Sequence, residues 1–162
     1  LSRLEEGTAA PETASVDLYA LAEDTLASLR PAAERREVTL TLCGGEAVVQ
    51  GVCTALQELV YNLCDNAVKY NRPGGSVTVT AEKRAGETVL SVADTGIGIP
   101  YEHQNRVFER FYRVDKSHSR QLGGTGLGLS IVKHAAAMHK ARLELWSEPG
   151  TGTKITVHFD GQ

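Results

Sequence analysis

The sequence contains no apolar run near the roughly 20 residues that a membrane-spanning helix needs, and no secretory signal opens it. Its three cysteines, Cys43, Cys53 and Cys64, are odd in number and form no Cys-x-x-Cys pair. This pattern excludes a disulfide framework and a zinc site built from Cys-x-x-Cys pairs. We therefore expect small, buried thiols in a reducing compartment, which points to the cytoplasm.

A strong charge excess is also missing. The 17 basic and 20 acidic residues give a net charge of −3 and a pI near 6.0, so we expect no nucleic-acid partner and no contact with an anionic membrane. Any polyanion must then be bound by a local cluster of Arg and Lys. With 162 residues, 41% of them hydrophobic, the chain suits one folded domain.

Apolar and polar residues alternate in patterns that predict an α/β fold. Leu1–Gly7 resembles the last turn of a helix, and Thr8–Ser15 reads as a linker, so the domain itself is expected over residues 16–162. Helical spacing continues from Leu18 to Leu29, where Pro31 is expected to interrupt it. The other predicted elements are helices over Val52–Tyr70 and Leu127–Met138, and three hairpins: Val38–Leu42 with Ala47–Val49, Ser76–Lys83 with Thr88–Ala93, and Arg142–Ser147 with Thr153–Phe159. Together they predict one sheet with about three helices on one face.

The second predicted helix carries a polar seam. Glu58, Asn62 and Asn66 are spaced four residues apart and spread over about 80° of the helix, and Lys69 lies about 20° from Asn62. Asparagine is a poor helix former, so the pair needs a reason. One reason is a polar patch or a solvated face. The other is a site where amide oxygens hold Mg²⁺ and Lys69 contacts phosphate.

Two glycine-rich segments follow. Asp94–Pro100 comes directly after a strand, where Asp94 can accept a hydrogen bond from the amino group of a purine. Gly123–Lys133 runs from a glycine-rich loop into a helix, which can cradle phosphates but matches neither a P-loop nor a dinucleotide fingerprint. A capped surface turn and a flexible linker are the simpler alternatives for the two segments.

Between them, Arg106–Arg113 places arginines on one side of a possible helix and aromatic residues on the other. The arginine side can bind a triphosphate and the aromatic side can pack on the domain.

In this order, the segments resemble the catalytic domain of sensor histidine kinases. The asparagine helix resembles the N box of the family, Asp94–Pro100 its first glycine box, Arg106–Arg113 its F box and Gly124–Gly128 its second glycine box. Glu148–Thr153 resembles its terminal glycine segment. The resemblance covers roughly residues 16 to 159 and implies the Bergerat fold, a two-layer α/β (α+β) sandwich. Its sheet is mixed, mostly antiparallel and of about five strands, with three helices on one face.

The resemblance also implies roles for individual residues. Asn62 and Asn66 would hold Mg²⁺, while Asn62, Arg113 and Glu58 would serve the transfer of the γ-phosphoryl group. The lid over the nucleotide would span about residues 101–125. The residues expected to contact ATP are Asn62, Asn66, Lys69, Tyr70, Asp94, Gly96, Gly98, Ile99, Arg113, Gly124, Thr125, Gly126, Leu127, Gly128 and Thr153.

The chain departs from the family in one respect. No histidine is followed by the acidic residue and proline of a phosphoacceptor motif, so His103 and His118 are read as lid or solvated residues and the others as structural. The resemblance therefore implies transfer from MgATP to a histidine on a dimerisation segment of the same protein, in a homodimer. It further implies a response-regulator receiver domain as partner and a parent protein anchored in the bacterial membrane.

Two other functions stay open. The first is an ATPase of the same fold, although such enzymes carry a carboxylate where this chain has Asn62, and an amide cannot act as a general base. The second is a module that senses nucleotide without transferring phosphate.

Overall fold

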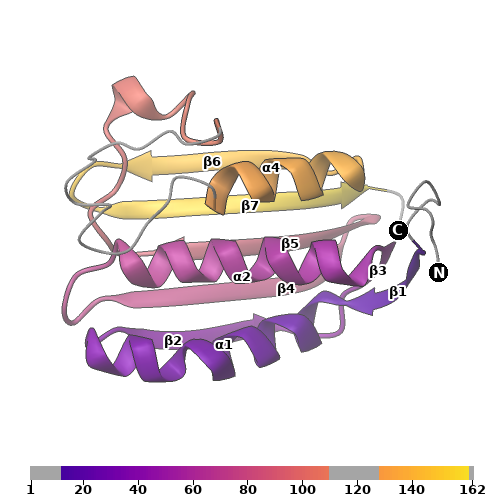
Figure 1. Cartoon of the computed structure of the whole chain (residues 1–162), viewed down its shortest axis with the longest axis horizontal. Coiled ribbons are helices and arrows are strands. Elements are labelled where there is room, and N and C mark those ends of the chain that lie inside the picture. Colours follow the sequence, from indigo (N-terminus) through magenta and orange to yellow (C-terminus); the bar gives the residue numbers. More distant parts are fainter. Residues whose placement is uncertain (1–11, 110–127, 161–162) are drawn as a thin grey trace, which may run out of the picture.

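Three α-helices lie side by side over one face of a sheet (Figure 1). The computed structural model describes residues 12–109 and 128–160. Within them the helices are α1 (Leu18–Arg35), α2 (Cys53–Lys69) and α4 (Gly128–Met138), together with the short 3₁₀ helix η1 (Tyr101–His103).

Five strands form the main sheet in the order β2-β4-β5-β7-β6. Strand β2 is parallel to β4, and every other pair is antiparallel. The strands are β2 (Thr39–Gly44), β4 (Ser76–Arg84), β5 (Glu87–Asp94), β6 (Arg142–Glu148) and β7 (Gly152–Asp160). The expected mixed, mostly antiparallel sheet is confirmed, and so are the two hairpins β4–β5 and β6–β7.

The first predicted hairpin is wrong. Val38–Leu42 contributes to β2, which joins the main sheet, whereas β3 (Val48–Gly51) pairs antiparallel with β1 (Ala14–Asp17), in part of the expected linker. The reason lies at Gly44, whose φ is 103° and where an added Cβ would overlap the backbone of Ala81. This glycine permits a close approach of β2 to β4 and does not form a tight turn back to β3.

Two further expectations need correction. Helix α1 continues through Pro31 to Arg35; the proline stands in the last turns, where Leu29 and Ala33 are buried in the core and hold the helix in place. Cys43 and Cys53 are exposed, and only Cys64 is buried. Cys43 lies near the end of edge strand β2, and Cys53 is the first residue of α2.

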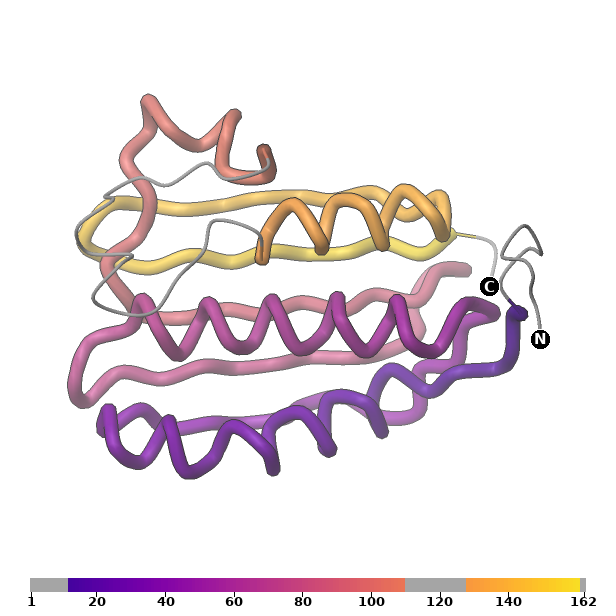
Figure 2. Tube along the Cα trace, in the orientation of Figure 1, coloured from indigo at the N-terminus to yellow at the C-terminus, as the bar shows by residue number. Residues whose placement is uncertain are grey.

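The core fills the space between the helices and the sheet. Alternate residues of the strands, such as Val77 and Val79 of β4 and Val157 of β7, pack against helix residues such as Leu56 and Leu59. Residues 101–109 lie beyond the edge strand β6 (Figure 2). Among the described residues no helix combines the length and hydrophobicity needed to cross a bilayer.

Candidate functional site

The polar seam of α2 faces the start of α4. The side-chain amide of Asn62 donates to the Glu58 carbonyl at 2.7 Å, so its nitrogen is occupied within the helix. A Cβ built on Gly128 would lie 3.3 Å from Oδ1 of Asn62 and 3.1 Å from Nδ2 of Asn66. The first residue of α4 therefore packs directly on the two asparagines, while the side chain of Glu58 is exposed one turn away.

The last turn of α2 carries an ion pair that the sequence reading did not single out. Lys69 Nζ lies 3.1 Å from a carboxylate oxygen of Asp65, one turn earlier. Both side chains are partly exposed. The pair holds the lysine on the same side of α2 as Asn62, at the rim of the seam.

Asp94 is the last residue of β5 and lies at the same end of the sheet as the C-terminus of α2. Its Oδ1 accepts the backbone N–H of Gly96 at 2.9 Å. Burial raises the pKa of the Asp94 carboxyl to about 6, although the backbone N–H groups of Gly96 and Thr153 lower it. Thr153 is opposite Asp94 in the register of β5 and β7. The chain thus keeps a half-buried hydrogen-bond acceptor at the strand end.

Residues 94–100, which we call the 94–100 loop, fold closely against two neighbouring segments. Ile97 N donates to the Tyr70 carbonyl at 3.1 Å, and Gly150 N donates to the Ile97 carbonyl at 2.8 Å. Gly98 has φ 72°, and an added Cβ there would overlap the backbone of Glu148. Only glycine meets both conditions. The predicted glycine segments at 96–98 and 148–153 are therefore packed together.

Three side chains that the sequence reading missed also hold this loop. Arg72 donates to the carbonyls of Gly96 and Gly150, and Gln104 donates to those of Ile99 and Ser147. The third, Ser147, is buried, and its hydroxyl accepts the Ile99 N–H at 2.8 Å. It also lies 2.8 Å from the Thr153 hydroxyl. No sequence motif marks these contacts, because their partners are 5 to 78 residues away along the chain.

Several predicted site residues lie outside the described part of the chain. In the expected arginine helix, residues 106–109 form turns, with Arg106 paired to Glu109 at 3.1 Å and Phe108 packed on the core. The residues outside are Arg113, Gly124, Thr125, Gly126 and Leu127, together with His118.

Of the three histidines expected to be structural, His139 and His158 have structural contacts, whereas His134 is exposed on α4. His139 accepts the Val52 N–H at Nε2 and lies against the Ala135 carbonyl at Nδ1. His158 is buried between the carboxylates of Glu87 and Glu144, at 2.5 and 2.9 Å. Neither ring is placed to accept a phosphoryl group, because both nitrogens are in use.

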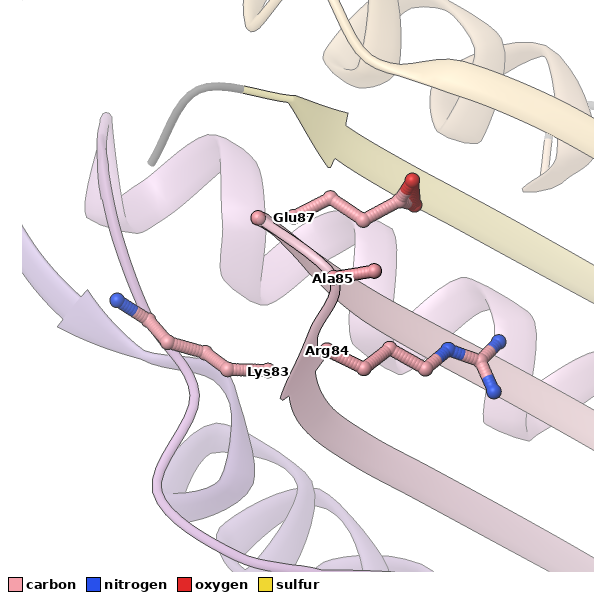
Figure 3. Close-up of a pocket in the computed structure, with 5 residues that line it drawn as sticks. Lys83, Arg84, Ala85 and Glu87 are labelled. Atoms are coloured by element: carbon pink, nitrogen blue, oxygen red, sulfur yellow. The ribbon is translucent and has the colours of Figure 1, made fainter.

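A cavity of about 210 Å³ lies elsewhere, at the turn between β4 and β5. It is formed by residues 83–87, and the side chains of Lys83 and Arg84 point in opposite directions (Figure 3). Because Glu87 begins β5 and Asp94 ends it, this cavity is at the far end of the strand. It is not part of the site around Asp94.

Helix α2 thus contacts the start of α4 through its asparagines and the 94–100 loop through its C-terminal end. A family comparison agrees with a site along this helix. Residues 51–162 match the model of the histidine kinase-, DNA gyrase B- and HSP90-like ATPases. The chain belongs to this ATPase family. Within it, the similar proteins are sensor histidine kinases, so the chain is a domain of the histidine kinase type, and the alternative functions are not favoured.

The chain is similar to curated histidine kinases over most of its length. It is 40% identical over 158 residues to the sensor-like histidine kinase SenX3 of Mycolicibacterium smegmatis, which is 97% of this chain and 41% of that protein. It is 43% identical over 139 residues to the phosphate regulon sensor protein PhoR of Pseudomonas aeruginosa, or 83% of this chain and 31% of that protein. The chain thus spans about two fifths or less of these curated relatives.

Solved structures agree in fold. The mycobacterial sensor histidine kinase MprB is 30% identical with a TM-score of 0.77, covering 90% of this chain and 95% of that one. Full-length ShkA in complex with AMPPNP is 26% identical with a TM-score of 0.80, covering 97% of this chain and 33% of that one. These matches confirm the three-helix sandwich predicted from the sequence.

Proposed function

We propose that this ATPase domain transfers the γ-phosphoryl group of MgATP to a histidine on a dimerisation segment of the same protein. One observation supports it above all: the start of α4 packs on the asparagines of α2, and the loop that follows Asp94 packs on the C-terminal end of the same helix. The similarity to ShkA, whose structure is a complex with AMPPNP, supports nucleotide binding there.

The base end of the nucleotide would be read by Asp94. An ionised carboxylate only accepts hydrogen bonds, so it pairs with the amino group of adenine and repels the carbonyl oxygen that guanine carries at the same position. Gly96, Gly98 and Ile99 would line this end, with Thr153 behind Asp94. The site should therefore prefer ATP over GTP by about 1–3 kcal/mol, the cost of leaving a buried polar group unpaired.

The phosphate end would lie over the seam of α2. Since the Asn62 nitrogen is bound within the helix, its oxygen is the atom available toward Gly128, and amide oxygens with waters and phosphates suit Mg²⁺. Bound Mg²⁺ supplies charge neutralisation at the phosphates. Lys69 would exchange Asp65 for a phosphate oxygen, and Tyr70 would contact the phosphates or ribose.

The family resemblance supports roles for further residues. Arg113 would neutralise charge on the γ-phosphate during transfer. Backbone N–H groups of the second glycine box would hold the other phosphates: Gly124, Thr125, Gly126, Leu127 and Gly128. Glu58 would assist near Asn62. The parent protein would be a membrane-anchored homodimer that passes its phosphoryl group to a response-regulator receiver domain.

The test is phosphotransfer in trans. The chain is incubated with γ-labelled MgATP and the parent's separately produced dimerisation segment, and acid-labile phosphohistidine is measured. We expect labelling of the segment that Asn62→Ala lowers at least about 100-fold, on the scale of one preorganised electrostatic group. Rapid phosphate release that does not depend on the segment would favour the ATPase alternative, and nucleotide binding without any transfer would favour the sensing module.

A further inference from the structure

Two of the three side chains that hold the 94–100 loop donate hydrogen bonds to its carbonyls. Arg72, in the turn after α2, donates from Nη2 to the Gly96 carbonyl at 2.7 Å and to the Gly150 carbonyl at 2.8 Å. The same guanidinium nitrogen therefore ties the beginning of the loop to the turn between β6 and β7. A charged donor strengthens both bonds.

Gln104 does the same at the other end of the loop. Its Nε2 donates to the Ile99 carbonyl at 2.9 Å and to the Ser147 carbonyl at 3.0 Å. The glutamine follows η1 and is half-buried, and Ser147 belongs to edge strand β6. Both side chains thus fasten the loop to the β6–β7 hairpin, one at each end.

The other hydrogen bonds of the loop use different atoms. Ile97 donates to Tyr70 and accepts from Gly150, and the Ile99 N–H binds the Ser147 hydroxyl. The carbonyls of Gly96 and Ile99 are left to the two side chains. Each end of the loop therefore depends on a side-chain donor for its orientation.

We propose that Arg72 and Gln104 are positioning residues that hold the 94–100 loop in its nucleotide-binding shape before nucleotide arrives. The inference rests on the proposed function, because the loop carries the acceptor Asp94. A loop fixed in advance loses less conformational entropy on binding, so removing either donor weakens binding. Neither side chain needs to touch nucleotide, and the loss should be equal for adenosine, ADP and ATP.

The test uses Arg72→Met and Gln104→Met, which keep side-chain length and remove the donors. Matched controls are Arg84→Met, at the far end of the sheet, and Gln57→Met, exposed on α2. Calorimetric titration with adenosine, ADP and ATP should show each variant binding all three about 3–10-fold more weakly. The controls should stay within about twofold, and Arg72→Lys should restore part of the loss.

Amide hydrogen exchange of the nucleotide-free chain gives an independent measurement. In both variants the amides of Ile97 and Ile99 should exchange faster than in the unchanged protein, while those of β4 stay the same. Unchanged affinity with unchanged loop exchange would overturn the inference, and so would faster exchange throughout the chain. If the unchanged protein binds no nucleotide, the proposed function fails, and the exchange measurement alone then decides whether the two side chains hold the loop.

Discussion

At the scale of single residues, the burial of Asp94 destabilises the folded chain but provides a charged hydrogen-bond acceptor. Burial raises its pKa to about 6, so near pH 7 the carboxylate is ionised in surroundings that disfavour charge. The Gly96 N–H compensates only in part. A neutral hydrogen-bond acceptor at this position would make the folded chain more stable. The presence of a carboxylate therefore supports a role in binding.

This cost predicts a pH-dependent stability. A carboxyl whose pKa is higher in the folded chain than in the unfolded one favours folding when protonated, so this contribution is lost as pH rises from about 4 to 6. Asp94→Asn keeps the oxygen that accepts from Gly96 and removes the charge. We expect it to raise the free energy of unfolding by about 1–3 kcal/mol at pH 7.5.

Urea unfolding at pH 4 and pH 7.5 measures this effect. The gain from Asp94→Asn should shrink toward zero at pH 4. A variant that is equally or less stable than the unchanged protein at pH 7.5 would contradict the assignment of the buried charge.

The sequence indicated the candidate residues but not the side chains that support them. Asp94 and Gly98 could be found because each follows from local requirements, a strand end and a positive φ. Arg72 and Ser147 could not, because their roles depend on partners from distant segments of the chain that only the folded sheet brings together.

At the scale of elements, the helices and the two antiparallel hairpins could be predicted, because adjacent segments with a short turn between them pair locally. The parallel pairing of β2 with β4 could not. Gly44 and Gly45 look like a turn in sequence, yet one of them meets Ala81 of the neighbouring strand. Nothing local distinguishes these two uses of glycine.

Paired substitutions test this account of β2. Gly44→Ala must place a Cβ against the backbone of Ala81 at a φ of 103°, whereas the same change at Gly45 meets nothing within 4 Å. We expect Gly44→Ala to lower the free energy of unfolding by about 2–4 kcal/mol and Gly45→Ala to change it by less than about 0.5 kcal/mol. Equal effects in chemical denaturation would contradict the close approach of β2 and β4.

A histidine joins the ends of α2 and α4. His139 accepts from Val52 N and contacts the Ala135 carbonyl, and its ring packs edge-on to Phe159 with centroids 6.2 Å apart. His139→Ala should lower the free energy of unfolding by about 1–3 kcal/mol, because a partly buried N–H loses its acceptor. His134→Ala, at an exposed position of α4, is the matched control and should change the free energy of unfolding by less than about 0.5 kcal/mol.

At the scale of the whole molecule, the candidate binding residues and the buried histidine cluster lie at opposite ends of the sheet. Strands β5 and β7 run from the cluster of His158 and Glu87 at one end to Asp94 and Thr153 at the other. The helices cover one face of the sheet, and the C-terminus of α2 and the start of α4 reach the binding end. The order of the motifs in the sequence was enough to predict this architecture. The distances between the residues of the candidate site could be obtained only from the folded chain.

Above all, we expect this end of the sandwich to bind ATP through Asp94. Calorimetric titration of the chain with ATP, with and without Mg²⁺, beside Asp94→Asn tests it most directly. We expect micromolar to submillimolar binding that Asp94→Asn weakens by about 1–3 kcal/mol, although the variant is the more stable protein. No detectable binding to the folded chain, or equal binding by the variant, would contradict the claim.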